Sequence, residues 1–579
     1  MYAVTTISAP TGGWNSTYPV TNLAQNEAIT LDNLIPDTGF VSNRLGYQTY
    51  CDLSADINTI ASLFEFRAAA MNKFVAAGEG KFYDITDAQA PVEIGTGFTN
   101  DYWNGTVFLD QAGAGGLILV NGEDAPQYWT GLGDVQALGV TGPATVSNLI
   151  DCVNFKNHVW FVEKNSQNPW YSPFDSIVGA ALTKFYLSGL GSFGGNLQTI
   201  KTFTADGGSG RQEFIAFYMT SGEIIIYQGA DPSDAADFIL VGVYRSGRPI
   251  PTARGVCKFG ADLVAITDSG YLPLSSLLSY SFGKSNDQLG EKIRGAALAA
   301  VNANFVGTNW QIILVQNYGL LLINVPTTTG GIINQHVLNV NTMAWSSFSG
   351  MPANVWCMFG NNLYFGDNTG VIWQYSGNLD GADQEGSGGA PITCTYTSPY
   401  LFNQPSGLLQ STAFRPRVLL GGNTTIFISS SADFQPYSPP YQINLSSTGI
   451  QWAAAAVVTP GPAGPPFVAN DFGINDPSYI PVSLDPIPWG RAAQAPYTPG
   501  PANLLYPLGD QRNLVYYGPD DPGAVPMGEI GWAQSSSNSL SFLNLSKVFY
   551  SLSIKLQFVV YDSINFYETD FLIKKAVRI

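Results

Sequence analysis

The chain has 579 residues, a formal net charge of −18, and only 12% charged residues. Typical soluble domains carry about 25% charged residues, so we expect partners to cover much of the surface. Neutralising nucleic-acid phosphates takes clustered Lys and Arg, and 43 acids outnumber 25 bases here, which argues against specific nucleic-acid binding. Five widely spaced cysteines without a CxxC pair argue against a disulfide framework or a zinc site.

Targeting signals are not evident in the sequence. No basic segment followed by an apolar run opens the chain, and no apolar run approaches the length of a membrane span. We therefore expect a protein made in the cytosol, with no membrane span. Residues 1–50 are irregular, and Pro36, Gly39 and Gly46 interrupt their short apolar stretches. We predict an extended N-terminal arm that leads into a first strand at Phe40–Tyr47.

Residues 51–380 predict a β-propeller. Seven pairs of apolar runs flank short turns rich in Gly, Asn or Asp, which is the pattern of a β-hairpin. They recur roughly every 40–60 residues, close to the period of four-stranded blades, so we expect six to eight blades. The seven hairpins are predicted at Lys73–Thr86, Gly116–Gly131, Asn157–Ser172, Phe214–Gly229, Asp262–Ser275, Ile312–Val325 and Asn362–Ser376.

Two segments have helical features. Asp175–Gly189 carries apolar residues at helical spacing, and Ser285–Ala303 is rich in alanine. In the second segment, Ser285 and Gln288 have the spacing of a capping box. We predict that both helices decorate the β scaffold.

The C-terminal part predicts a second β domain, β-sandwich-like, at 381–435 and 529–579. A linker-like stretch at Gly377–Pro391 precedes it. A Pro/Gly-rich insertion at 436–528 interrupts it and is too long for an ordinary loop. Alternating apolar residues in Leu552–Phe558 are typical of a sandwich edge strand with one solvent-facing side. The fold class is therefore all-β.

Catalytic, cofactor-binding and metal-binding signatures are absent from the sequence. His158 and His336 lie in apolar runs and are expected to be buried structural residues. Phe282–Ser285 has the end of a phosphate loop, but Leu278 stands where that loop needs glycine. Phe365–Trp373 only faintly resembles an aspartate box. We expect no enzyme, no cofactor and no metal site; a propeller glycosidase, which needs two carboxylates about 5–10 Å apart, remains an alternative.

Two aromatic stretches could form a sugar-binding platform. They are Asn168–Phe174 and Pro126–Gly131, and packing between blades is the favoured interpretation of both. Asp231–Asp237 contains three acids and is interpreted as a polar turn rather than a calcium site. The run Gly222–Gly229 is interpreted as a buried blade strand.

A series of motifs resembles the β-propeller tail proteins of short-tailed bacteriophages and related prophages. This family includes the tail nozzle, or tail tubular protein B, and the hub or packaged-DNA stabilisation proteins. The resemblance covers roughly residues 8–376 and rests on turn and strand motifs rather than on a catalytic signature. In order, the motifs are APTGGWN, LDNLIPDTGFVSNRLGY, VNGEDAPQYWTG, FKNHVWFVEKNSQNPWYSP, TSGEIIIYQGADPSDAADFILVGVYRSGRPI and DLVAITDSGYLPLS.

The resemblance implies a structural virion protein that forms a homo-oligomeric ring, a hexamer, below the portal and adaptor proteins. The ring would extend the DNA channel, contact tail fibres or distal tail proteins, and let DNA pass without specific binding. Its location would be the virion tail, after assembly in the cytoplasm of the bacterial host. A receptor-binding, adhesin-like tail protein with a glycan site is the alternative.

Six residues in the motif loops are candidates for interactions. Arginines beside prolines on loops suit subunit contacts or pairing with carboxylates. The candidates are Arg44, Tyr47, Asp231, Arg245, Arg248 and Arg254.

Overall fold

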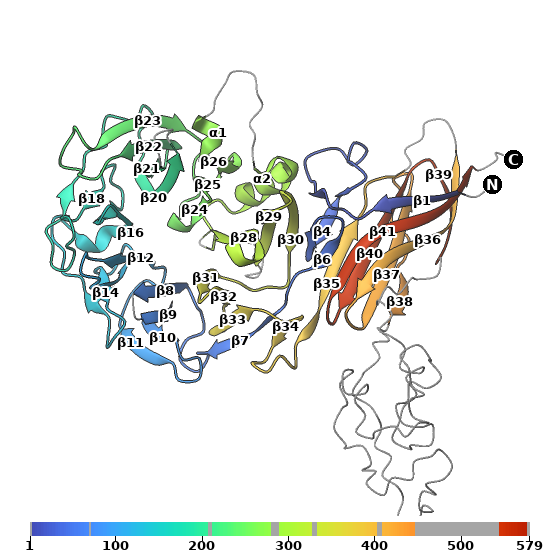
Figure 1. The fold of residues 1–579 in the computed structure, drawn as a ribbon, viewed down its shortest axis with the longest axis horizontal. Helices are drawn as coiled ribbons and strands as arrows, with labels where there is room; N and C mark the ends of the chain where they lie inside the picture. Colours follow the sequence, from blue (N-terminus) through green and yellow to red (C-terminus); the bar gives the residue numbers. More distant parts are fainter. Residues whose placement is uncertain are drawn as a thin grey trace, which may run out of the picture. The chain divides into compact units, whose positions relative to one another are not determined.

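The computed structural model describes residues 3–68, 71–206, 211–278, 289–307, 309–326, 333–401, 408–445 and 543–575. The chain divides into two compact units, and these residues belong to the first unit apart from Leu419–Gly422. The predicted insertion at 436–528 lies outside the described residues beyond Leu445. The all-β fold class is confirmed: a β-propeller and a sandwich-like domain make up the described part of the chain (Figure 1).

Seven blades form the propeller, each a sheet of antiparallel strands that are mostly consecutive in sequence (Figure 1). Blades 1 to 4 are complete four-stranded sheets. From the inner to the outer strand, they consist of β8 (Ser62–Ala68), β9 (Met71–Gly78), β10 (Lys81–Asp84) and β11 (Val92–Thr96); β12 (Asn104–Leu109), β13 (Gly115–Val120), β14 (Gln127–Trp129) and β15 (Gln136–Ala137); β16 (Leu149–Phe155), β17 (His158–Glu163), β18 (Trp170–Tyr171) and β19 (Thr183–Lys184); and β20 (Leu197–Asp206), β21 (Arg211–Met219), β22 (Glu223–Gln228) and β23 (Ile239–Arg245).

Blades 5 to 7 differ from the separate four-stranded sheets of blades 1 to 4. Blade 5 has three strands, and the outer strands of blades 6 and 7 continue into a larger sheet. These blades consist of β24 (Val256–Phe259), β25 (Asp262–Thr267) and β26 (Gly270–Pro273); β27 (Gln311–Val315), β28 (Leu320–Pro326), β29 (Ile333–Asn339) and β30 (Ala344–Phe348); and β31 (Val355–Phe359), β32 (Asn362–Gly366), β33 (Val371–Tyr375) and β7 (Tyr47–Asp52).

The ring of blades is closed by a strand from near the N-terminus. The inner strands β8, β12, β16, β20, β24, β27 and β31 contact one another in turn, and β31 contacts β8. The outer strand of blade 7 is β7, which pairs antiparallel with β33 and places Thr49 opposite Trp373. The last blade therefore holds together segments from both ends of the propeller sequence.

All seven predicted hairpins are confirmed, one in each blade. The blade number falls within the predicted six to eight. Strand β22 is buried along almost its whole length, as expected from its apolar sequence. Apolar clusters fill the spaces between neighbouring blades, such as the cluster around Trp103 and Trp129 between blades 1 and 2.

The helix predicted at Asp175–Gly189 is wrong. Asp175 and Gly179 have left-handed backbones, with φ of 57° and 68°, which an α-helix cannot contain. Turns and the short β19 replace the helix, and the apolar residues Ile177, Leu182 and Leu187 are buried. The apolar residues are therefore spaced as in a helix because each is buried in the core, and not because the segment is helical.

The second helix is confirmed in its last part as α2 (Arg294–Ala303), which follows the 3-10 turn η3 (Glu291–Ile293). The predicted cap residues Ser285 and Gln288, and the Phe282–Ser285 motif, lie outside the described residues. The other short helices are α1 (Leu274–Leu278), η1 (Val146–Asn148), η2 (Ala253–Gly255) and η4 (Gln316–Tyr318). None of the described helices has the length and the apolar run that crossing a bilayer requires.

Two sheets make up the sandwich-like domain. The rings of Phe558 and Phe566, one from each sheet, lie 6.1 Å apart, and Tyr396 lies 5.6 Å from Phe566. One sheet contains β1 (Ala3–Ser8), β5 (Leu34–Pro36), β6 (Val41–Asn43), β36 (Leu409–Leu420), β39 (Leu543–Phe549) and β41 (Ile564–Lys575). The other contains β4 (Thr30–Asp32), β35 (Ala390–Thr397), β37 (Thr424–Ala432), β38 (Tyr441–Leu445) and β40 (Leu552–Val560).

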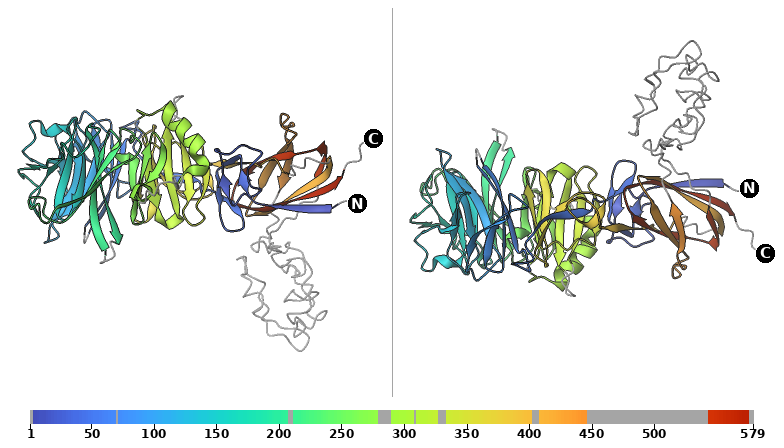
Figure 2. Two further views of the ribbon diagram at one scale, coloured as in Figure 1. Left: turned by 90° about the horizontal axis from the view of Figure 1, so that it is seen from above. Right: turned by 90° about the horizontal axis from the view of Figure 1, so that it is seen from below.

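The N-terminal segment differs from the predicted arm. Strand β1 pairs with β41 near the chain ends (Figures 1 and 2). Strand β4 pairs with β30 of blade 6 and with β35 of the sandwich, and β2 (Gly13–Trp14) pairs with β3 (Glu27–Ala28). The single strand predicted at Phe40–Tyr47 is wrong, because β6 ends at Asn43 and β7 begins at Tyr47.

Two further predictions need correction. The linker-like stretch Gly377–Pro391 contains β34 (Leu379–Ala382), which pairs with both β7 and β35. In strand β40 burial alternates from Ile554 onward, whereas Leu552 and Ser553 are buried as well, so the alternation predicted over Leu552–Phe558 holds only in its later part. The strand is not an edge strand, because it lies between β35 and β37. Its neighbour β37 is distant in sequence, so the alternation of apolar residues within β40 could not predict that β40 has a strand on each side.

Candidate functional site

The inner strands of the propeller surround an axial channel, which contains a cavity of about 200 Å³. Liquid water occupies about 30 Å³ per molecule, so this cavity has room for several waters and for no macromolecule. All seven inner strands contribute to its lining, with Leu63, Phe64, Asn104, Gly105, Asp151, Lys201, Val256, Gln311, Ile312 and Val355.

Arg254 bridges the channel at this end. It lies in η2, directly before the inner strand of blade 5. Its guanidinium donates hydrogen bonds to the Ala61 carbonyl oxygen at 2.9 Å and the Ser62 hydroxyl at 2.7 Å. A third bond reaches the Trp103 carbonyl oxygen at 2.7 Å, and the guanidinium stacks 3.9 Å from the Tyr102 ring centre. These acceptors lie where the inner strands of blades 1 and 2 begin, so one side chain joins opposite parts of the ring.

The carboxylate of Asp151 is held in place within the channel. It accepts hydrogen bonds from the Thr199 hydroxyl at 2.6 Å and the Ile200 amide at 3.3 Å, and it pairs with Lys201 at 3.4 Å. Among the described residues that line this cavity, Asp151 is the one carboxylate. The two-carboxylate arrangement of a glycosidase is therefore not present in this lining.

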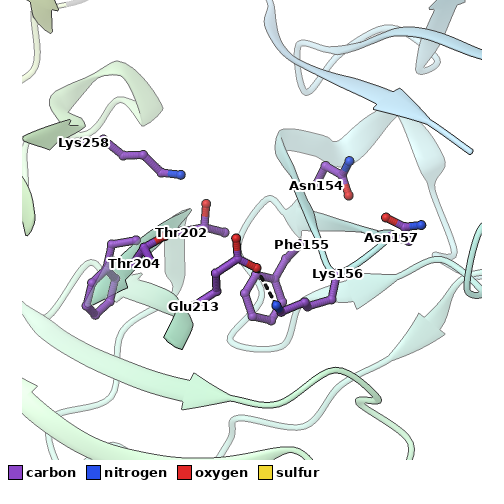
Figure 3. A pocket seen from close by; sticks show the side chains of 9 residues that line it. Asn154, Phe155, Lys156, Asn157, Thr202, Thr204, Glu213 and Lys258 are labelled. Atoms are coloured by element: carbon purple, nitrogen blue, oxygen red, sulfur yellow. Dashed lines mark ion pairs between the residues drawn. The ribbon is translucent and has the colours of Figure 1, made fainter. Parts of the chain in front are cut away.

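A second pocket, of about 330 Å³, lies near the ends of β16 and β20. Lys156 and Glu213 form an ion pair of 2.6 Å at its edge, and Lys258 points towards them from the opposite side (Figure 3). Asn154 contributes a buried side-chain oxygen without a hydrogen-bond partner among the described residues. The pocket is polar, so a hydroxylated or amide ligand matches its chemistry better than an apolar one.

Arg44 and Tyr47 are interior residues. The Arg44 side chain is fully buried and contacts both carboxylate oxygens of Asp380 at 2.7 Å. The Tyr47 hydroxyl donates to the Gly350 carbonyl oxygen at 3.1 Å, and burial raises the pKa of Tyr47 to about 12. The interaction role predicted for these two residues is wrong, because neither presents a surface to a partner.

The remaining candidates lie around blades 4 and 5. Arg245 ends β23 and stacks 3.9 Å from the ring centre of Phe193. Arg248 pairs with Asp268 at 2.9 Å, and its side chain is 61% exposed. Asp231 belongs to the exposed loop before β23 and accepts hydrogen bonds from Ser233. The six predicted residues thus occupy separate places: the interior, the channel, and the two ends of β23.

Aromatic packing accounts for most of the candidate sugar platforms. Trp129 is buried against Phe66, and Tyr171 packs on Trp160 with ring centres 5.2 Å apart. Phe174 is exposed and contacts His158. In the Phe365–Trp373 turn, the buried Asp367 accepts a bond from the Trp373 indole at 2.9 Å, so its role here is structural.

Both histidines are buried and hydrogen-bonded. His158 Nδ1 lies 2.7 Å from the Ser172 carbonyl oxygen, and His336 Nδ1 lies 2.7 Å from the Tyr271 hydroxyl. Burial lowers the pKa of His336 to about 4. All five cysteines are free. Within the described ranges, no group of three or more His, Cys, Asp or Glu side chains could hold a metal ion.

Sequence reasoning missed the partners that define these sites. Asp380 and Asp151 stand in no recognisable motif, and their roles depend on chain segments far away in sequence. A local signal did exist for β23: the run DPSDAADFILVGVYRSGR has acids before an apolar strand and arginines after it. The acids thus precede the exposed strand β23, and the arginines lie at and after its end.

No family model matches the chain, and no curated protein matches it by sequence. Solved structures with a similar course include the computationally designed Ika8 protein, with a TM-score of 0.33 and 10% identity over 60% of this chain and 96% of the other. Another is BBS1N in complex with ARL6DN, with a TM-score of 0.36 and 10% identity over 57% of this chain and 98% of the other. At this level of likeness the propeller assignment rests on the strand pairing itself.

Proposed function

We propose that this chain is a structural virion protein, a nozzle or hub in the tail of a short-tailed bacteriophage. Copies of it form a closed ring, a hexamer, that continues the DNA channel below the portal and adaptor proteins. The ring guides or retains the genome during packaging and ejection. The proposal begins from the motif series over roughly residues 8–376, which resembles that family of tail proteins.

The observation that carries the proposal is the Arg254 bridge. It ties blade 5 to blades 1 and 2 across the axial channel, and the cavity beside it measures about 200 Å³. A propeller closed in this way is a solid building block, and DNA cannot pass along its axis. A channel for DNA must then lie between several copies of the chain, which is what a ring provides.

The charge of the chain supports a conduit. A net charge of −18 makes the chain repel phosphates, so DNA moving past it would meet few positive sites that slow it. The low charged fraction of 12% agrees with a surface that is partly covered by neighbouring subunits. The Asp151 carboxylate in the channel already accepts a hydrogen bond from Thr199 and pairs with Lys201. This favours a structural role for the propeller over a catalytic one.

Electron microscopy of virions that carry a tag on this chain tests the proposal. We expect the label on the tail axis, in a ring directly below the portal and adaptor. Label on peripheral fibres would contradict the nozzle assignment. Virions without any label would contradict a structural role altogether.

A second candidate is a receptor-binding tail protein with a glycan site. The polar pocket of Lys156, Glu213 and Lys258 favours it (Figure 3). In that case the isolated chain binds a glycan, and Lys258→Ala weakens binding at least about tenfold. Arg248→Ala, distant from this pocket, is the matched control. Absence of binding on a glycan array, with tail-axis label in virions, would exclude this candidate.

A further inference from the structure

Strand β23 leaves an apolar edge of the propeller exposed. It is the outer strand of blade 4 and pairs with β22 on its inner side. Its large side chains are unusually accessible: Ile239 is 48% exposed, Val241 41% and Val243 38%. Edge strands that are long and apolar attract other chains unless they are short, charged or covered. Such an edge therefore needs an explanation.

The other blades protect their outer strands. Strand β34 covers β7, β4 covers β30, and α2 packs against β26. The outer strands β15 and β19 have two residues each, and β11 carries Glu93 paired with Lys81. Among the described blades, β23 is the longest outer strand, with seven residues. Helix α1 contacts it, yet Ile239, Val241 and Val243 stay accessible.

Opposite charges flank this edge. The loop before the strand contains Asp231, Asp234 and Asp237, and the residues after its apolar part include Arg245 and Arg248. All three aspartates are exposed. A strand with acids at one end, apolar residues in the middle and bases at the other end is complementary to a second copy of itself in antiparallel orientation.

Residue spacing fixes a register for that arrangement. Centring the pair on Val241 places Val243 of one copy opposite Ile239 of the other. Continued to the two ends of the strand, the same register brings Arg245 of one copy near Asp237 of the other. A bulge at Val241 interrupts the ladder with β22, so apolar side chains and charge pairs, rather than an unbroken backbone ladder, would carry the contact.

We propose that two copies of this chain associate along β23, antiparallel and centred on Val241. The contact is two-fold, with the same surface on both chains, whereas a closed ring needs head-to-tail contacts between different surfaces. The β23 contact therefore joins two chains, or chains of two rings. It goes beyond the proposed nozzle function and stands or falls separately from it.

Sedimentation velocity over a range of concentrations tests this contact with the full chain. We expect a discrete two-fold species for the wild type, and Val243→Lys is expected to weaken association at least about tenfold. Val92→Lys is the matched control, because Val92 is a 56% exposed valine on the outer strand β11. It should leave association unchanged.

Charge reversal tests the register. Arg245→Asp should weaken association, and adding Asp237→Arg in the same chain should restore it. Val241→Cys should give a disulfide-linked dimer under mild oxidation, because the two Val241 positions meet at the two-fold axis. The native cysteines are buried or half-buried, so the unmodified chain is the background control.

Three results would overturn the proposal. They are a wild type that stays monomeric at all concentrations, a Val241→Cys chain that forms no cross-linked dimer, and a Val243→Lys chain that associates normally. If Val243→Lys instead abolishes docking to a portal–adaptor complex while the wild type is monomeric, the edge belongs to another partner and self-association is excluded. Ring formation on the portal–adaptor complex is measured separately and reports on the proposed function alone.

Discussion

Arg254 and Arg248 lie close in sequence but in different surroundings. Arg254 donates three hydrogen bonds across the channel, whereas Arg248 holds an exposed ion pair with Asp268. We expect Arg254→Ala to lower the free energy of unfolding by about 2 kcal/mol, because the hydrogen bonds to Ala61, Ser62 and Trp103 are lost. Arg248→Ala, the control, should cost less than about 1 kcal/mol. Urea unfolding measures both, and equal effects would contradict the bridging role.

His336 makes stability depend on pH. Its pKa is lowered by burial from 6.5 to about 4 in the folded chain. Between these values the unfolded chain binds a proton that the folded chain does not. The free energy of unfolding therefore falls as the pH decreases from about 6.5 to 4, by up to about 3 kcal/mol, and is unaffected by His336 above that window. Urea unfolding at several pH values measures this slope.

The control for this slope is His336→Asn, which keeps a neutral polar group beside Tyr271 and cannot gain the proton. It should flatten the profile between pH 6.5 and 4. Carboxylates with lowered pKa, such as Asp84 and Asp570, act below that window. An unchanged slope in His336→Asn would show that other groups dominate it.

Residue roles were predictable only where they depend on local sequence. Buried histidines and the acidic turn follow from their neighbours in the chain. The burial of Arg44 does not, because its partner Asp380 is 336 residues away. A loop arginine beside turn residues gives the same sequence signal whether it faces solvent or a distant carboxylate.

Strand β7 depends on a close approach between backbones at the residue directly before it. A Cβ atom on Gly46, directly before β7, would lie 2.0 Å from the Leu379 carbonyl oxygen of β34. We expect Gly46→Ala to push these strands apart and to lower the free energy of unfolding by about 2 kcal/mol. Hydrogen exchange should show faster opening of β7 and β33.

The control for this prediction is Gly290→Ala, whose Cβ would meet no atom closer than 3.3 Å. It should leave both the stability and the exchange of β7 close to those of the wild type. Protection of β7 that is unchanged in Gly46→Ala would contradict the close approach.

Hairpins were the elements that the sequence predicted best. Each is encoded by two apolar runs and a turn within about 15 residues, so no distant segment is needed to specify it. The pairing of β7 with β33, and of β40 with β37, joins distant segments and leaves no local pattern. The false helix at Asp175–Gly189 has a related cause, since its apolar residues contact several strands rather than one helical face.

At the scale of the whole chain, the negative net charge determines how weakly the protein binds DNA. Non-specific DNA-binding proteins reach dissociation constants of about 1–100 μM through phosphate contacts. With a net charge of −18, we expect this chain to bind duplex DNA more weakly than about 100 μM even at low salt. Fluorescence anisotropy with a labelled duplex measures this. Micromolar binding that weakens with added salt would contradict a passive conduit.

Strand pairing between the two ends of the chain has a consequence for synthesis on the ribosome. The hydroxyl of Thr6 in β1 donates to Asp570 in β41, 564 residues later. At about 5–20 residues per second, β1 waits roughly half a minute to two minutes for this partner. During that time the blades can form in sequence while the sandwich remains incomplete. Synthesis of β41, rather than the folding of any single blade, therefore sets the earliest moment at which the sandwich can close.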